Sequence, residues 1–404
     1  MYQHALESVF EEDKMRLITP ESSSHPSESE ALRPGAAQES ELPATSREGE
    51  TRKSGIPQSP DTRAAPTPAR RDPEAESDLR DASIEGNMAA VKGILEAGWV
   101  DVNSRGGDSL TPVMRAALRG HRKVVELLVR EGADVSLVNV YGDNILHLAC
   151  RGGHMETVKF VLSLNVVDIN STGWRSRTPV MEAAVWGHSD VVELLVSEGA
   201  DVSRVNVYGD NILHLACRGG HMGTVKFVLS LKFADINSRG WRSRTPMIKA
   251  VLKGHREVVE FLVSEGADVS LVNVYGDNIL HMACRGGHME TVKFVPSLNM
   301  VDINSRGWRS RTPVMRATVV GHREVVELLV SEGADVSLVD DDGNNIFQLA
   351  CAGGDVGTVK FVLSLNVVDI DAMNNIGQTA GDRARLRRYQ KIVKLLEPPR
   401  CHVM

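Results

Sequence analysis

The sequence is poor in aromatic residues, in long apolar runs and in clustered positive charge, and each shortage excludes a class of protein. Phe, Trp and Tyr make up 4% of the 404 residues although 42% are hydrophobic, so we expect thin cores built from Leu, Val and Ala. No apolar run reaches the ~20 residues that a membrane-spanning helix needs, and the N-terminus is acidic where a signal peptide is basic. We therefore expect an intracellular, cytoplasmic protein without membrane insertion, and leave nuclear entry open.

Charge argues against a nucleic-acid binder. The formal net charge is -7, and the residues through Ala75 hold fourteen acidic and nine basic side chains, so about -5 of it lies there. A polyanion binder needs clustered Lys and Arg. No G-x-x-x-x-G-K-S/T pattern occurs, so a nucleotide site has no support and no cofactor is predicted.

Composition divides the chain into two parts. Residues 1–75 are rich in Ser, Pro and Glu and are predicted to be a disordered tail, because they cannot bury enough surface to offset chain entropy. From Ser77 onward the sequence repeats every 67 residues, in two interleaved series of anchors: Thr111, Thr178, Thr245, Thr312 and Thr379, and Asn144, Asn211, Asn278 and Asn345. A period of 33 plus 34 residues indicates a stacked array of short units.

Each unit should fold as two antiparallel helices and a projecting loop. Thr111 is a good helix N-cap and Pro112 suits the first helical position, so a short helix should run to about Arg119. A second helix with an apolar stripe should end at Gly132. The segment Asp134–Asp143 is then expected to project as a hairpin-like finger.

These units resemble the ankyrin-repeat family. The resemblance is carried by T-P-x-x-x-A-x-x-x-G-H…V-V-x-L-L-V-x-x-G-A-D-V after each Thr anchor and by N-I-L-H-L-A-C-x-G-G-H at Asn144 and Asn211. It implies an all-α solenoid of about ten stacked helix-turn-helix units with hairpin-like loops, which binds proteins. The predicted solenoid, 76–400, comprises 77–110, 111–143, 144–177, 178–210, 211–244, 245–277, 278–311, 312–344, 345–378 and a C-terminal cap, 379–400.

Four departures from the repeat pattern carry structural predictions. Asn144 and its equivalents replace Thr-Pro but should cap helices equally well. The Gly132 position holds Lys232 in one unit, a poor fit for a left-handed residue, whereas three others hold the more tolerant Asn165, Asn299 and Asn366. Pro296 replaces Leu late in a helix, at a cost of up to about 3 kcal/mol. The last unit should end in one basic helix, Asp382 to Glu397.

His147, Cys150 and His154 recur in later units at spacings that place side chains on one helix face, so a metal site or a Cys/His nucleophile pair is one interpretation. We favour a structural role, in which the histidines bond between neighbouring units and Cys replaces a small buried Ala. The cysteines lie too far apart along the stack for disulfides. No catalytic or metal-binding residue is predicted, and the protein is not expected to be an enzyme.

The fingertips hold the candidate binding residues. Trp and Arg in one type of finger alternate with Tyr in the other, and these types are enriched at interface hot spots. The predicted partner-binding residues are Tyr141, Trp174, Arg175, Arg177, Trp186, Tyr208, Trp241, Arg242, Arg244, Tyr275, Trp308, Arg309 and Arg311. In the alternative, each Trp packs on the neighbouring finger under a stacked Arg and stabilises the array without a partner.

The fingers and an adjoining concave helical face mix apolar and basic residues, which suits an extended acidic-hydrophobic segment of another protein. We predict a non-catalytic scaffold or adaptor. A regulatory subunit or substrate adaptor for an enzyme such as a ubiquitin ligase is the alternative, and a nucleic-acid binder is disfavoured. The resemblance also implies asparagine hydroxylation at Asn103, Asn170 and Asn237, whose side chains alternatively have a structural role in the finger.

Overall fold

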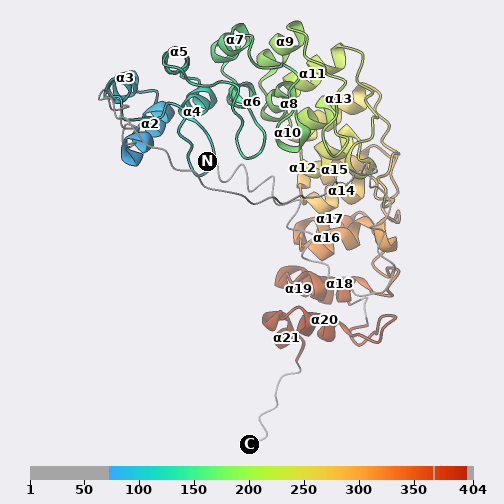
Figure 1. Cartoon of the computed structure of the whole chain (residues 1–404). Coiled ribbons are helices and arrows are strands. Elements are labelled where there is room, and N and C mark those ends of the chain that lie inside the picture. Colours follow the sequence, from blue (N-terminus) through green and yellow to red (C-terminus); the bar gives the residue numbers. More distant parts are fainter. Residues whose placement is uncertain (1–71, 367–368, 398–404) are drawn as a thin grey trace, which may run out of the picture. The chain divides into compact units, whose positions relative to one another are not determined.

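The computed structural model describes residues 72–366 and 369–397, and in these ranges the regular elements are helices arranged in ten successive pairs (Figure 1). The predicted disordered tail is residues 1–75, and all but its last four residues lie outside the described residues. The first helix, α2 (Pro73–Glu85), begins before the expected Ser77, because the Asp72 carboxylate accepts the backbone N–H groups of Glu74 and Ala75.

The eight interior pairs each have a first helix of 8 residues and a second helix of 9, whereas α2 has 13 residues and α20 and α21 have 7 each. The first helices of the ten pairs are α2, α4 (Pro112–Arg119), α6 (Ile145–Gly152), α8 (Pro179–Trp186), α10 (Ile212–Gly219), α12 (Pro246–Lys253), α14 (Ile279–Gly286), α16 (Pro313–Val320), α18 (Ile346–Gly353) and α20 (Ala380–Leu386). The second helices are α3 (Met88–Glu96), α5 (Arg122–Arg130), α7 (Met155–Ser163), α9 (Ser189–Ser197), α11 (Met222–Ser230), α13 (Arg256–Ser264), α15 (Met289–Ser297), α17 (Arg323–Ser331), α19 (Val356–Ser364) and α21 (Gln390–Leu396).

The first helices begin and end where the sequence predicts. Thr111 caps α4 by accepting the Met114 N–H at 3.4 Å, and Pro112 follows at the first helical position. Asn144 caps α6 by accepting the N–H groups of Leu146 and His147. α4 ends at Gly120, whose φ of 80° lies in the left-handed region that glycine tolerates.

The core is continuous along the stack and consists of small and branched aliphatic side chains. First helices pack on neighbouring first helices, and second helices on neighbouring second helices. The buried cluster extends from Leu79 to Ile392, with Ala117, Cys150 and Ala184 fully buried where first helices meet. Because each unit buries its apolar stripe against its neighbours, the stack is stabilised by contacts between adjacent units.

The second helices show the expected irregularities. Lys232 has a φ of 56°, and the equivalent Asn165, Asn299 and Asn366 have φ of 51–52°. Pro296 lies inside α15, which continues to Ser297. The prediction of one helix from Asp382 to Glu397 is wrong: Arg388, with a φ of 60°, separates α20 from α21, and the Tyr389 ring lies against Gly354 of the preceding unit.

Candidate functional site

The loops between the pairs form two kinds of finger. The valine fingers are residues 137–143, 204–210 and 271–277, and the tryptophan fingers are residues 172–177, 239–244 and 306–311. In the first valine finger the Asn139 N–H donates to the Asp143 carbonyl at 3.0 Å, and the Asn139 side-chain oxygen accepts from the N–H groups of Tyr141 and Asp143. The same bonds recur at Asn206 and Asn273, so each valine finger is a closed turn.

The tryptophan fingers each contain a 3-10 turn: η2 (Trp174–Ser176), η3 (Trp241–Ser243) and η4 (Trp308–Ser310). Asp143 of the preceding valine finger holds the first one in place, because its carboxylate accepts the Trp174 N–H at 2.7 Å. A Cβ on Gly173 would lie 2.2 Å from that carboxylate, so the close approach requires glycine. Asp210 and Asp277 accept from Trp241 and Trp308 in the same way, both at 3.0 Å.

Backbone bonds also join each tryptophan finger to the next valine finger. The Val207 N–H donates to the Arg175 carbonyl, and the Val274 N–H donates to the Arg242 carbonyl, both at 3.0 Å. Three exposed arginine side chains add a second tie, since Arg105, Arg239 and Arg306 donate to carbonyls of the following finger at 2.9–3.1 Å. The fingers therefore form a row with fixed spacing.

The predicted tryptophans are half-buried beneath arginines. The guanidinium carbon of Arg175 lies 4.3 Å from the Trp174 ring centroid and 5.0 Å from that of Tyr208. Arg242 lies in the same way between Trp241 and Tyr275, at 4.5 and 5.2 Å. The stacking expected in the packing alternative is thus present, and it leaves Arg175 and Arg242 held between two aromatic rings.

The second arginine of each tryptophan finger is buried and does not lie at the fingertip, contrary to the sequence-based expectation. Arg177, Arg244 and Arg311 are only 2%, 1% and 5% exposed. Arg177 turns inward to Glu182 at 3.4 Å, and Arg311 pairs with Asp340 at 3.0 Å. Arg177 therefore binds its finger to α8, Arg311 binds its finger to the loop that follows α17, and none of the three side chains is exposed at the fingertips.

Buried ion pairs lie under the finger row. Arg151 bridges Asp143 at 2.7 Å and Glu182 at 3.0 Å. Burial raises the pKa of Glu182, but the guanidinium groups of Arg151 and Arg177 outweigh it and lower that pKa to about 2. Later units replace the glutamate by a cation, so Lys249 pairs with Asp210 at 2.9 Å and Arg316 pairs with Asp277. Removing one member of such a pair costs roughly 3–5 kcal/mol.

The histidines and cysteines have the structural roles predicted for them. His147, His214 and His281 are buried, and each places Nε2 at 3.0–3.1 Å from a carbonyl at the end of the next finger. Cys150, Cys217, Cys284 and Cys351 are buried free thiols, and burial raises the pKa of each. Within residues 72–366 and 369–397, no three metal-ligating side chains lie close enough to hold an ion.

Exposed valines on the valine fingers are the surface feature that the sequence reasoning missed. Val140, Val207 and Val274 are 63%, 60% and 59% exposed, and a second set on the same fingers is also exposed: Val138, Val205 and Val272. Tyr141 and Tyr275 beside them are exposed, and Tyr208 is half-buried. The signal was the threefold repetition of V-N-V-Y-G-D-N, with apolar residues alternating in otherwise polar loops. A repeated apolar surface of this kind is typical of an interaction site.

Comparison with known proteins identifies the family to which this architecture belongs. The family model described as ankyrin repeats (3 copies) matches residues 79–173, 113–206, 180–273 and 265–340. The chain belongs to the ankyrin-repeat family. Ankyrin repeats are protein–protein interaction modules, so the general function indicated for this chain is binding to another protein.

Similar ankyrin proteins share the repeats rather than a whole architecture. The human transient receptor potential cation channel subfamily A member 1 is 26% identical over 74% of this chain and 28% of its own length. The ankyrin repeat and KH domain-containing protein mask-1 of Caenorhabditis elegans is 30% identical over 62% of this chain and 10% of its own. The E3 ubiquitin-protein ligase KEG of Arabidopsis thaliana is 23% identical over 76% of this chain and 20% of its own length. The chain spans less than a third of each relative.

The asparagines considered for hydroxylation bind neighbouring ankyrin units together. The side-chain oxygens of Asn103, Asn170 and Asn237 accept the backbone N–H groups of Asp134, Asp201 and Asp268 at 2.8, 2.7 and 2.9 Å. All three side chains are half-buried. The structural role that the sequence suggested is therefore present at each site.

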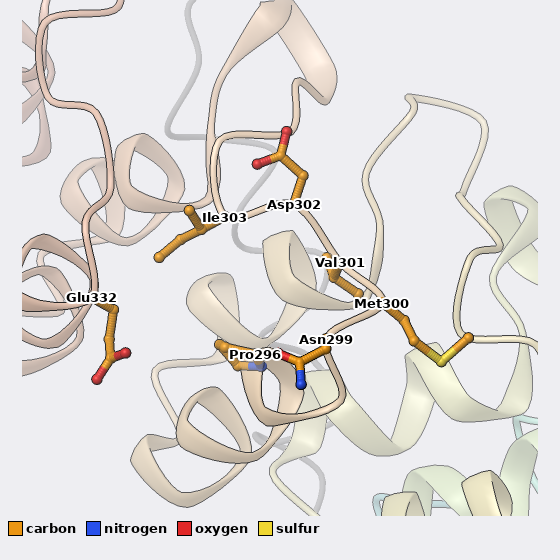
Figure 2. Close-up of a pocket in the computed structure, with 7 residues that line it drawn as sticks. All are labelled: Pro296, Asn299, Met300, Val301, Asp302, Ile303 and Glu332. Carbon is orange, nitrogen blue, oxygen red and sulfur yellow. The ribbon is translucent and has the colours of Figure 1, made fainter.

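Two further features lie outside the finger row. On the first-helix face Trp186 is 38% exposed, whereas Leu252 of α12 is buried. An open pocket beside α15, shown in Figure 2, is lined by Pro296, Asn299, Met300, Val301, Asp302, Ile303 and Glu332.

In the described part of the chain, no helix combines the length and apolarity that crossing a membrane requires.

Proposed function

We propose that this ankyrin-repeat protein is a non-catalytic scaffold or adaptor that binds a partner protein through its finger row. The observation that carries the proposal is the repetition of exposed Val140, Val207 and Val274 on rigid turns. Exposed branched side chains gain free energy when a partner removes them from water. Because the fingers are already held by backbone bonds, little ordering opposes binding.

The originally predicted residues divide into two groups within this proposal. Tyr141, Tyr208, Tyr275, Arg175, Arg242 and Arg309 contact the partner, and Trp186 extends the surface onto the first helices. Trp174, Trp241 and Trp308 support the arginines from beneath. We place the protein in the cytoplasm, where the free thiols of Cys150 and its equivalents stay reduced.

The test compares two matched triple variants of the full chain as bait for proteins in a cell lysate. The finger variant carries Val140→Ser, Val207→Ser and Val274→Ser. The control carries Val166→Ser, Phe233→Ser and Met300→Ser, which are similarly exposed apolar residues after the second helices. We expect the finger variant to lose proteins that the parent and the control retain. Identical sets from all three baits would contradict the proposal.

Hydroxylation of Asn103, Asn170 and Asn237 stays a proposal drawn from the family resemblance. The three residues occupy equivalent loop positions and make equivalent bonds. Mass spectrometry of the protein isolated from cells should find one added oxygen atom on peptides that contain them. Unmodified peptides at all three positions would show that their role is structural alone.

A further inference from the structure

The two ends of the stack of helix pairs carry opposite charges. The first helix, α2, contains five acidic residues and one basic residue, Arg80. The last pair with its connecting turn, residues 380–396, contains six basic residues and one acidic residue, Asp382. These helices lie at the two ends of the described stack, since α2 packs on α3 and α4, and α21 packs on α19 and α20 (Figure 1). Each end therefore presents a helix face that no other described helix covers.

The acidic residues of α2 form one exposed stripe. The spacings of three and four residues place four carboxylates on one face of the helix: Glu74, Asp78, Asp81 and Glu85. All four side chains are exposed, and none has an ion-pair or hydrogen-bond partner among the described residues. Arg80 does not neutralise them, because it donates to the Ser104 hydroxyl at 3.4 Å. Like charges at these spacings repel, so the stripe opposes the stability of its own helix.

Interior units show what the position of Asp81 does when another unit precedes it. Four later first helices have a charged residue at the equivalent position, and each pairs with a side chain of opposite charge in the preceding unit. The pairs are Arg115 with Asp108 at 2.8 Å, Glu182 with Arg151 at 3.0 Å, Lys249 with Asp210 at 2.9 Å, and Arg316 with Asp277. Asp81 thus holds a charge at the position that joins one unit to the unit before it.

The pair between Glu182 and Arg151 is the closest model for Asp81. It joins an acidic residue of one first helix, α8, to an arginine of the preceding first helix, α6. In the last first helix, α20, the position of Arg151 holds Leu386, which is 66% exposed and has Arg385 and Arg387 beside it. The far end of the stack therefore has positive charge where an acidic first helix would dock.

Most of the positive charge at this end is unpaired. Arg385 pairs with Asp382 at 3.0 Å. Four other basic side chains have no ion-pair partner among the described residues: Arg387, Arg388, Lys391 and Lys394. Arg388 has a φ of 60° where the nine earlier pairs have a left-handed glycine, so a basic residue is kept at an unfavourable backbone position. Leu386 and the 37% exposed Leu395 add apolar surface that a neighbour would cover.

We propose that the α2 end of one copy of this protein binds the α20–α21 end of a second copy. The carboxylate stripe takes the place that Glu182 has within the chain, and the arginines of α20 take the place of Arg151. This contact leaves one free end on each copy, so it builds open chains or rings. Because each end face consists of two short helices, the association is weak and sensitive to salt. The inference goes beyond the proposed function, since it uses the ends of the stack and not the fingers.

Sedimentation velocity of the full chain tests the proposal. We expect the mean mass to rise beyond that of two chains at concentrations on the order of 10–100 µM in low salt, and to fall back in about 0.5 M salt. A chain that stays monomeric over this range would overturn the proposal, and its charged ends would then serve solubility alone. Association that stops at two chains would overturn the head-to-tail arrangement.

Charge-reversed variants test the pairing itself. The α2-end variant carries Asp78→Lys, Asp81→Lys and Glu85→Lys. The α21-end variant carries Arg388→Glu, Lys391→Glu and Lys394→Glu. Each variant alone should lose self-association, because both of its ends then have the same sign. A mixture of the two should associate again, since the basic ends of one meet the acidic ends of the other. A mixture that stays monomeric, with both variants folded by circular dichroism, would overturn the proposal.

Two further variants separate the end contact from net charge and from the fingers. The variant Glu193→Lys, Glu198→Lys and Glu265→Lys changes the net charge as much as the α2-end variant does, but on exposed residues of interior units. It should associate like the parent, and its failure to do so would assign the association to net charge. The Val140, Val207 and Val274 serine variant should also associate like the parent, even where it no longer captures a partner.

Discussion

The residue Lys232 occupies a backbone position that suits glycine or asparagine. Its φ is 56°, and the equivalent positions in other units hold Asn165, Asn299 or a glycine such as Gly132. A residue other than Gly, Asn or Asp in this left-handed region lowers the free energy of unfolding by about 1 kcal/mol. Lys232→Asn should therefore raise the free energy of unfolding by roughly 0.5–1 kcal/mol, measured by urea denaturation. Lys159→Asn on the exposed face of α7 is the control and should lower it slightly.

Thr172 occupies a position where three other fingers have an arginine that bonds to the next finger. Equivalent positions hold Arg105, Arg239 and Arg306, each of which donates to a carbonyl of the next finger. Thr172→Arg should create the missing bond to the Val205 carbonyl and stabilise the fold by roughly 0.5–1 kcal/mol. A calorimetric melting temperature that is unchanged from that of the parent would mean that the three natural ties contribute nothing.

Single residues show clearly what sequence could and could not predict. Helix caps and left-handed positions depend on local geometry, so Asn144 and Gly132 were predicted with their roles. The burial of Arg177 depends on Glu182, which lies in the next helix, and a fingertip motif does not reveal which way an arginine turns. The exposure of Val140 was not predicted, because a valine in a loop motif does not reveal whether it packs on a neighbouring unit or faces solvent.

Among the second helices of the described residues, α15 has a defect, the proline at position 296. Pro296 removes a backbone donor from its last turn, and an open pocket lies beside it (Figure 2). Pro296→Leu restores the side chain found at Leu162, Leu229 and Leu363, and should raise the free energy of unfolding by about 1–3 kcal/mol. Hydrogen exchange of α15 should slow accordingly.

The converse substitution gives the control for that prediction. Leu162→Pro in α7 should cost a similar amount, because α7 and α15 differ little in sequence. If Pro296→Leu leaves exchange in α15 unchanged, the helix tolerates the missing bond and the predicted weakness is absent. The last unit shows a different limit of sequence-based prediction. The turn between α20 and α21 was missed because Tyr389 replaces the usual histidine, so the local turn motif was absent.

For the whole molecule, the repeated buried histidines make stability depend on pH. Burial lowers the pKa of His147 and His281 and lowers that of His214 to about 4, against about 6.5 when unfolded. Between these values the unfolded chain binds more protons than the folded chain, so stability present above pH ~6.5 is lost as pH falls towards ~4. At pH 5 the loss is roughly 1–2 kcal/mol for a site such as His214.

Gln348 supplies the matched substitution for this test, because it occupies the equivalent position in α18 and donates to the carbonyls of Ala372 and Gln378. The triple variant His147→Gln, His214→Gln and His281→Gln should lose less free energy of unfolding between pH 7 and pH 5 than the parent. Urea denaturation at the two pH values measures this. An unchanged difference would assign the acid sensitivity to other groups.

For the whole molecule the fold was predictable from the sequence, and the proposed binding surface was only partly predictable. A period of 67 residues and the Thr and Asn anchors were enough to predict the stacked helix pairs. The alternation of Trp/Arg fingers with Tyr fingers was expected from the sequence, whereas the burial of Arg177 and the exposure of Val140 required coordinates. The predicted disordered tail, residues 1–75, lies outside the described residues up to residue 71, and its last three residues belong to α2.

The central claim is that the fingertips are the binding surface. Hydrogen–deuterium exchange of the full chain, with and without a partner recovered through the capture experiment, tests it most directly. The account predicts protection concentrated in residues 137–143, 204–210 and 271–277 and in the tryptophan fingers between them. Protection confined to the second helices or to residues 1–71, with the fingers unchanged, would contradict it.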